Sequence, residues 1–264
     1  MPSYYAHYKF AEEVCGRLPD KPKTIAENNK TLYLIGAHGP DIFFYYKPLK
    51  KNPVNSLGND MHQEHAAPFF ERAADVVSHS RDRDASLAYI FGFITHFMLD
   101  SACHGYVAEK MRESGVSHTA VETDFDRELM IADGLDPLRI KPVSYVLSEK
   151  EYAEVIAEFF SIDADDIIKA LKSMKRCDSI MIARSGIKRA LIRLVLKIAG
   201  KYAYMGGLVM TPKPNPDCAD SSARLKKLLY ANVEAASELI ADYAEYVSDG
   251  ARGSLNARFD RNYE

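Results

Sequence analysis

Hydrophobic residues recur every three to four positions along almost the whole chain, which is the period of an amphipathic α-helix. No pair of segments alternates apolar and polar residues as paired strands would, and no internal repeat or low-complexity tract is visible. The pattern therefore predicts an all-α fold, a multi-helix bundle. The predicted helices cover residues 4–17, 23–36, 61–79, 84–112, 116–133, 148–160, 163–174, 179–205 and 219–248.

Two proline-containing segments interrupt this helical pattern. Residues 36–60 form the longest predicted irregular stretch, and a loop of that length inside a domain is usually functional or mobile. Residues 210–217 contain three prolines and form a second connector. No hydrophilic linker separates the two halves of the chain. We therefore predict a single domain over residues 1–264, in preference to a catalytic half followed by a partner domain.

The overall composition narrows the function classes. The 264 residues include 37 acidic and 34 basic side chains, a formal charge of -3, which argues against a dedicated nucleic-acid-binding surface. The four cysteines are scattered without a CxxC or disulfide-scaffold spacing. The first residues lack the basic and apolar segments of a signal peptide, and no uncharged apolar run is long enough to span a bilayer. We expect a cytoplasmic protein.

Residues 185–204 mix lysines and arginines with isoleucine, leucine and valine. A basic amphipathic helix of this kind can lie on an anionic membrane, which would make the segment a peripheral membrane contact. The same pattern is also that of a core helix with a solvated charged face, and we favour this second interpretation.

The strongest chemical signal is a run of metal-ligand side chains at four-residue steps: His96, Asp100 and His104. A four-residue step on an α-helix keeps side chains on one face. The preceding residues are strongly apolar, so burying three unpaired polar groups here would be costly. Imidazole and carboxylate at this spacing are suitable ligands for a divalent metal. We therefore predict a metal site and a metallohydrolase.

The same spacing indicates more than one ion. The Cα atoms of His96 and His104 would lie about 12 Å apart along the axis, whereas a metal–nitrogen bond is about 2 Å long. Asp100 lies midway, where its two oxygens can bridge neighbouring ions. A second pair, His118 and Glu122, repeats the four-residue step and is predicted to complete the ion that His104 begins.

These motifs resemble those of the zinc-dependent phospholipase C family, whose wider superfamily includes nucleases of the P1 type. The resemblance extends from residue 7 to residue 126 and is carried by Ala6-His7, the segment Gly36–Tyr46 with its Gly39-Pro40-Asp41, Met61-His62, the run His96–His104 and the run His118–Glu122. The plain His-x3-Asp-x3-His form is that of cytosolic bacterial members. The secreted enzymes instead have a longer central motif and an N-terminal tryptophan, and this chain has no tryptophan.

The resemblance implies two or three zinc ions, although other divalent metals are compatible with the same ligands. His62, His96 and Asp100 would hold one ion, and His104, His118 and Glu122 a second. His7 and Asp100 match the side-chain ligands of a third ion, which in the secreted phospholipases also uses the N-terminal residue. Asp41 matches the loop aspartate that is the proposed general base or water-orienting group.

Several neighbouring residues have supporting or alternative roles. His65 competes with His62 for the same ligand position, and His38 is a candidate for contacting the ligands or the substrate. Asp126, one helical turn beyond Glu122, is a candidate to orient a ligand imidazole, as are Asp124 and Glu64.

The predicted function is hydrolysis of a phosphodiester, with a small phosphoester or a phospholipid head group as substrate. Two alternatives stay open. One is a nuclease or nucleotide phosphatase on the same scaffold. The other is a non-catalytic domain in which the ions serve structure or sensing.

Overall fold

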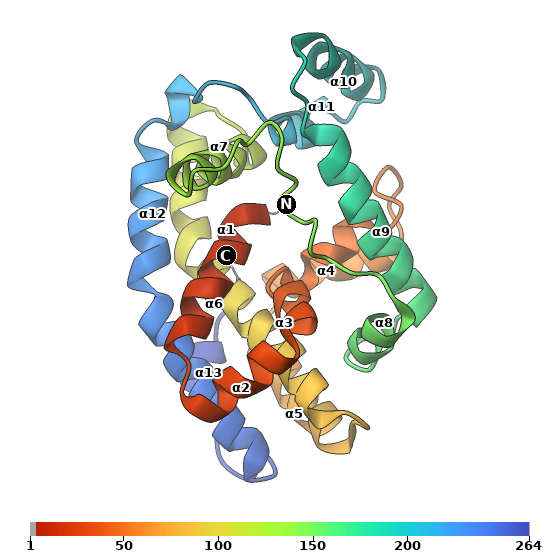
Figure 1. Ribbon diagram of the computed structural model, residues 1–264, viewed down its shortest axis with the longest axis vertical. Coiled ribbons are helices and arrows are strands. Elements are labelled where there is room, and N and C mark those ends of the chain that lie inside the picture. The colour runs from red at the N-terminus through yellow and green to blue at the C-terminus, as the bar shows by residue number, and fades with distance from the viewer. Residues whose placement is uncertain (1–3, 264) are drawn as a thin grey trace.

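The protein is an assembly of helices around one long central helix (Figure 1). A computed structural model describes residues 4–263. Within that range there is no β-strand, which confirms the all-α prediction. The α-helices are α1 (Tyr4–Arg17), α2 (Asp20–Asn28), α3 (Lys30–Gly36), α4 (Pro53–Gln63), α5 (Ala67–His79), α6 (Arg83–Ser114), α7 (His118–Ala132), α8 (Lys150–Ala157), α9 (Ala164–Met181), α10 (Gly186–Ile198), α11 (Tyr202–Met205), α12 (Ser221–Ala231) and α13 (Val233–Ser248), with short 3₁₀ helices η1 (Gly39–Tyr45), η2 (Gly206–Leu208), η3 (Pro216–Cys218) and η4 (Ala257–Phe259).

The central helix, α6, begins and ends at clear local signals. The Asp82 side chain accepts a hydrogen bond from the Ala85 N–H and caps its first turn. Gly115, in the left-handed conformation at φ 70°, ends it. By length and hydropathy α6 could cross a membrane, but 89% of its most apolar window is buried inside the protein. It is therefore a core helix here.

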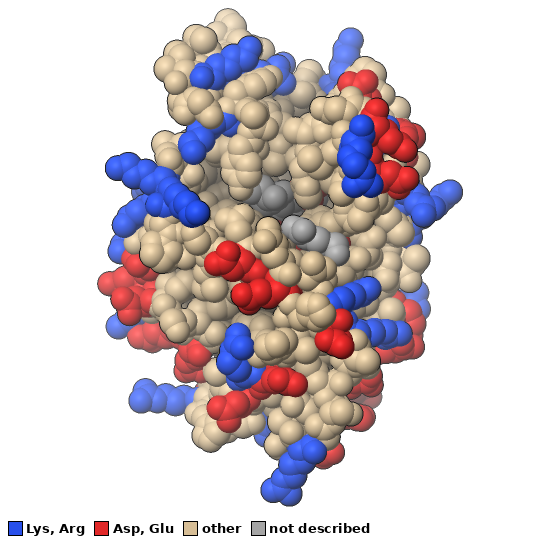
Figure 2. Space-filling view, turned by 180° about the vertical axis from the view of Figure 1, so that it is seen from behind, with Lys and Arg blue, Asp and Glu red and all other residues tan. Residues whose placement is uncertain are grey.

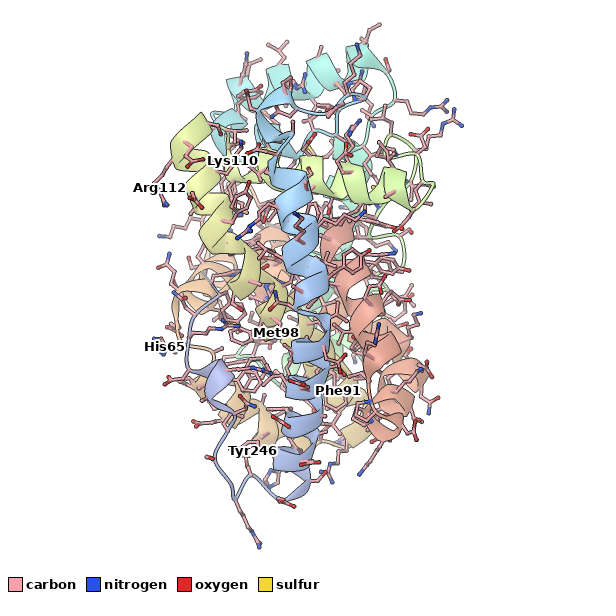
Figure 3. All side chains as sticks on the ribbon, turned by 90° about the vertical axis from the view of Figure 1, so that its left-hand side faces the viewer. His65, Phe91, Met98, Lys110, Arg112 and Tyr246 are labelled. Atoms are coloured by element: carbon pink, nitrogen blue, oxygen red, sulfur yellow. The ribbon has the colours of Figure 1, made fainter. Side chains whose placement is uncertain are left out.

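The other helices pack around α6 and bury it. Gly36 and Gly92 allow α3 to approach closely, because a Cβ at either position would lie about 2 Å from a backbone oxygen of the other helix. Helices α12 and α13 run along α6 and α1 from the far end of the chain (Figure 3). The main hydrophobic core thus extends from Tyr4 to Tyr263. This is compatible with the single-domain organisation, which stays a prediction.

Several predicted helices are broken in the structure. Residues 23–36 form α2 and α3, with a break at Asn29, whose side-chain amide donates to the Ile25 carbonyl. Residues 61–79 are divided between α4 and α5, because Pro68 lacks an N–H and can stand only in the first turn of a new helix. Residues 219–248 form α12 and α13.

Two further predictions about irregular and helical segments were wrong in part. The segment 36–60 is largely helical: it contains η1 and most of α4, which starts at Pro53 behind a capping box between Asn52 and Asn55. In the second half, α9 continues to Met181, and the predicted helix 179–205 is instead the end of α9 followed by α10 and α11.

Candidate metal centre

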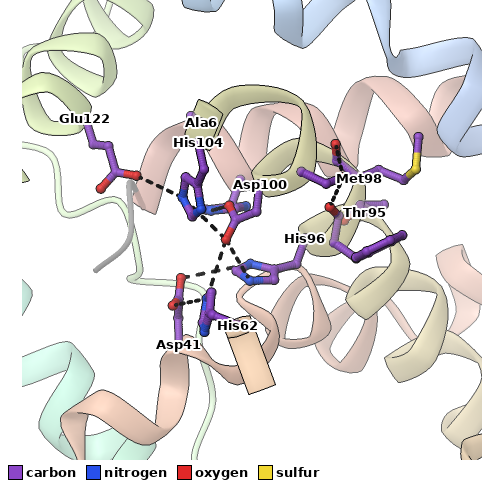
Figure 4. Close-up of polar contacts among 12 residues, drawn as sticks. Ala6, Asp41, His62, Thr95, His96, Met98, Asp100, His104 and Glu122 are labelled. Atoms are coloured by element: carbon purple, nitrogen blue, oxygen red, sulfur yellow. Dashed lines mark hydrogen bonds and ion pairs between the residues drawn. The ribbon is translucent and has the colours of Figure 1, made fainter. Parts of the chain in front are cut away.

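Asp100 lies at the centre of a buried cluster of histidines (Figure 4). Its Oδ2 atom lies 3.2 Å from His96 Nε2, 3.5 Å from His62 Nε2 and 3.6 Å from His104 Nε2. Its Oδ1 atom lies 3.2 Å from His7 Nε2. The carboxylate thus faces one nitrogen from each of four histidines, which come from α1, α4 and both ends of the α6 run. Asp100 is therefore a candidate metal ligand at the centre of the cluster.

One group of possible ligands consists of His104, His118 and Glu122, whose donor atoms all lie within 4.8 Å of one another. Glu122 Oε1 is 2.9 Å from His118 Nε2 and 3.6 Å from His104 Nε2. The loop between α6 and α7 turns the chain so that the first residue of α7 faces the last histidine of the α6 run. The sequence predicted this set, and the structure places its members together.

The remaining ligand atoms form two groups that share His96. His7, His96 and Asp100 make one, and Asp41, His62 and His96 make the other. His62 Nε2 lies 3.3 Å from Asp41 Oδ1, slightly closer than the 3.5 Å that separates it from Asp100 Oδ2. Asp41 is therefore placed both to act as a metal ligand itself and to act next to the ligand His62. The N-terminal residue that the family resemblance implies for a third ion lies outside the described residues.

Local contacts fix the orientation of these ligands. His62 Nδ1 lies 2.6 Å from the Gly58 carbonyl, so that Nδ1–H donates and Nε2 is left to face the carboxylates. Asp126 accepts the backbone N–H groups of Tyr5 and Ala6 at 2.9 and 2.8 Å and so holds the first turn of α1, which carries His7.

The cluster is charged and largely buried. Burial by itself raises the pKa of the Asp100 carboxyl, but the histidines around it outweigh burial and hold that pKa well below its usual value. Burial lowers the pKa of His62, but the Asp100 and Asp41 carboxylates overcome this and raise it to about 10. The pKa of Glu122 is lowered, burial being opposed by His118 and His104. The carboxylates of the cluster therefore favour positive charge on the groups that they surround.

Several ring nitrogens in the cluster lack the hydrogen bonds that buried polar atoms normally make. Among the residues that the structure describes, no hydrogen-bond partner is found for either nitrogen of His96, for Nδ1 of His7 or for Nδ1 of His104. Divalent ions would provide partners for donor sets of imidazole and carboxylate, so the residues present fit zinc.

Some predicted supporting residues lie elsewhere. His65 was wrong as an alternative ligand: its side chain is 64% exposed and pairs with Asp260, because the break after α4 turns it outward. Asp126 accepts the N–H groups at the start of α1, the helix that carries His7, so its role in supporting a ligand stays a prediction. Asp124 accepts from the Asn215 N–H instead, and Glu64 is exposed.

His38 is buried beside the cluster, but its hydrogen-bonded nitrogen, Nε2, contacts Tyr145 and not a candidate ligand. Its Nε2 lies 2.6 Å from the Tyr145 hydroxyl, and its ring centroid is 6.4 Å from that of His7. Burial, reinforced by the charge of His7, lowers the pKa of His38 to about 3. It is a neutral group packed against the ligands.

A cavity of about 330 Å³ opens onto Asp41, His62, Asp100, His104, His118 and Glu122. Phe44, Asn59, Gln63 and Tyr204 complete its walls, and Phe44 stacks on His62 with ring centroids 5.5 Å apart. Sequence reasoning missed Tyr204, because nothing in its local sequence shows that α11 returns to this site.

Tyr263 was also missed. Its N–H donates to the His62 carbonyl at 3.2 Å, and its buried ring lies against the rings of His62 and His96, with centroids 5.4 and 5.8 Å away. The C-terminal segment thus covers one side of the site.

An all-α fold with a buried cluster of imidazole and carboxylate side chains around one shared aspartate is typical of metal-dependent hydrolases. A family model described as zinc dependent phospholipase C matches residues 6–174. The chain therefore belongs to the zinc-dependent phospholipase C family, and so to the metal-dependent phosphodiester hydrolases in general. No curated protein and no solved structure matches it significantly.

Proposed function

We propose that the protein hydrolyses a small phosphodiester or phospholipid head group with two or three zinc ions held by His7, His62, His96, Asp100, His104, His118 and Glu122. The observation that carries the proposal is Asp100, whose two oxygens face nitrogens of four histidines within 3.6 Å. A carboxylate so placed is suited to bridge ions, and adjacent ions suit phosphoester chemistry.

The bound ions would polarise the phosphoryl oxygens, activate a water and stabilise the leaving alkoxide. The protein positions the other participants. Asp41 lies at the cavity wall beside His62, where its carboxylate orients the attacking water and accepts its proton. η1 holds this side chain in place, and the backbone N–H of Asp41 donates to the His38 carbonyl.

The cavity supports a small substrate group. Its volume of about 330 Å³ suits a head group rather than acyl chains or an oligonucleotide. None of the described residues that line it is a lysine or arginine, so phosphate charge must be neutralised by the ions. Phe44 and Tyr204 supply aromatic walls. These features favour the phospholipase C-like reaction over the nuclease alternative.

The test combines metal analysis of protein purified without added ions with hydrolysis assays. Chromogenic phosphocholine, a chromogenic bis-phosphodiester and a nucleotide monoester are compared as substrates. We expect two or three zinc ions per chain and the highest kcat/KM on a phosphodiester. Fewer than one ion per chain, even after metal is resupplied, would refute the multinuclear site. Bound metal without turnover of any substrate would support the sensing alternative.

A matched pair of variants distinguishes the loss of a metal ligand from the loss of an exposed histidine. His62→Ala is expected to lower metal content and to reduce kcat/KM by at least about 100-fold, because it removes a ligand. His65→Ala, three residues away but exposed, is expected to change neither. Asp41→Asn is expected to lower kcat by about 10²–10⁴-fold, the range for loss of a general base.

A further inference from the structure

Helix α10 exposes its apolar face, which a core helix would bury. Five apolar side chains on it are more than half exposed: Ile187 (84%), Leu191 (58%), Leu194 (53%), Val195 (55%) and Ile198 (80%). Only Leu196 is buried on this helix, in a small cluster separate from the main core. The favoured interpretation of residues 185–204 as a core helix with a solvated charged face is therefore wrong for α10.

The exposed apolar side chains form a continuous stripe. At about 100° per residue they span an arc of about 100°, with Ile198 and Leu191 nearest its middle. Lys188 and Lys197 flank the stripe on opposite sides. The inward face carries Arg189, whose guanidinium donates to the carbonyls of Ala183 and Arg184 at 2.7 and 2.9 Å and so anchors the helix. An apolar stripe bordered by lysines is the pattern of a helix that lies in a membrane interface.

The charged residues of the chain segment that contains α10 are all basic. No acidic residue lies between Asp178 and Asp217. The basic residues of this interval are Arg184, Lys188, Arg189, Arg193, Lys197, Lys201 and Lys213. Figure 2 shows α10 as a knob at the upper left, where lysine and arginine stand among uncharged residues without acidic neighbours. A second copy of the chain would bring two such cationic surfaces together, whereas an anionic lipid surface complements them.

The helix is also connected to the site. α10 leads through residues 199–201 into α11, and Tyr204 of α11 lines the cavity that contains Glu122 and Asp41. η2 then packs on the start of α7, where a Cβ on Gly207 would lie 2.4 Å from Thr119 Oγ1. The position of α10 is thus tied to the rim of the site.

We infer that α10 docks on an anionic phospholipid bilayer, with its apolar stripe in the boundary between head groups and acyl chains and its lysines on the lipid phosphates. Docking brings the rim at Tyr204 to the lipid surface. Binding does not require turnover, so it is tested separately from the proposed hydrolysis.

The first experiment is flotation of the full chain with two kinds of vesicle. One is phosphatidylcholine alone, and the other contains about 30% phosphatidylglycerol, which gives it the negative surface potential of an anionic leaflet. We expect binding to the anionic vesicles that weakens at least about tenfold as salt rises from about 50 to about 500 mM, because the lysine contacts are screened. Absence of binding to anionic vesicles at low salt would overturn the inference.

Matched double variants test the stripe. Ile187→Ser with Ile198→Ser is expected to lower vesicle binding at least about tenfold, because it removes the two most exposed apolar side chains of the stripe. Leu49→Ser with Ile131→Ser, which removes exposed apolar side chains elsewhere, is expected to leave it unchanged. Both doubles are expected to retain hydrolysis of the soluble chromogenic phosphodiester. Equal vesicle binding by the two doubles would overturn the inference whatever the outcome of the hydrolysis assay.

The absence of tryptophan from the chain allows a direct report of insertion. The emission of Leu191→Trp is expected to shift to shorter wavelength and to be quenched by brominated lipids when anionic vesicles are added, whereas that of Ile131→Trp is not. A protein that forms a dimer in sedimentation, with the dimer lost in Ile187→Ser with Ile198→Ser, would instead assign the stripe to a second copy and overturn the inference.

Discussion

Gly39 occupies a position beside the metal ligands in which a side chain of even one carbon has no room. It precedes Pro40 and Asp41, and its φ of +49° lies in the left-handed region. A Cβ built on it would lie 2.3 Å from Cδ2 and 2.5 Å from Cγ of the His96 ring. We predict that Gly39→Ala damages the metal site and the fold together.

The magnitude follows from two contributions. A left-handed conformation costs an alanine about 1–2 kcal/mol. Relief of the overlap requires a shift of about 1 Å, because normal carbon contacts begin near about 3.5 Å. His96 is completely buried, so this is overpacking, which typically costs about 1–3 kcal/mol. We expect the free energy of unfolding to fall by about 2–5 kcal/mol.

The shift that relieves the overlap with His96 also moves candidate metal ligands apart. Either His96 turns away from Asp100, or η1 moves and carries Asp41 with it. Bound zinc per chain should therefore fall together with stability.

The assays are urea unfolding of the zinc-loaded protein and zinc analysis after dialysis. Gly16→Ala is the control, because a Cβ there meets nothing within 4 Å and alanine is the better helix former by about 0.5–1 kcal/mol. If Gly39→Ala binds as much zinc as the wild type and unfolds within about 0.5 kcal/mol of it, the contact with His96 does not constrain the site and the reasoning is wrong.

Three further predictions follow from single carboxylates. Asp100→Asn should lose zinc and reduce kcat/KM by at least about 100-fold, as measured by metal analysis and chromogenic assay, because the bridging charge is removed. Asp126→Ala should lower the free energy of unfolding by about 2–4 kcal/mol in urea, because two buried N–H groups at Tyr5 and Ala6 lose their acceptor. Asp178 has its pKa raised by burial to about 7. Between about pH 4 and 7 the folded state holds a proton on Asp178 that the unfolded state has lost, so the free energy of unfolding falls as pH rises. Asp178→Asn should remove this loss and raise the free energy of unfolding by up to about 4 kcal/mol at about pH 8, with no gain at about pH 3. Urea unfolding at the two pH values measures the difference.

The two ends of the ligand set show how much the sequence predicts. His104, His118 and Glu122 were predicted as one group, because all three lie on two consecutive helices with four-residue steps, and helical geometry is local. The group around His62 was only partly predicted. The sequence assigned Asp41 a role beside the ions, but it did not show that Asp41 lies as close to His62 as Asp100 does.

The same limit applies to the supporting residues. Asp126 lies one turn from Glu122, and the sequence predicted a role near the ligands. In the structure it caps α1, because the start of α1 packs against α7 through contacts across more than a hundred residues. Tyr204 and Tyr263 carry no local signal at all, since their place at the site depends on how distant helices return to it.

Helical periodicity and four-residue steps thus predicted, from the sequence alone, the all-α class, the central helix and most of the candidate ligands, because each depends on contacts within a few residues of the chain. The outward turn of His65 and the cavity walls depended on the tertiary structure. So did the exposed stripe of α10. A sequence pattern shows that a helix has an apolar side, but only the packing of the whole chain decides whether that side is covered.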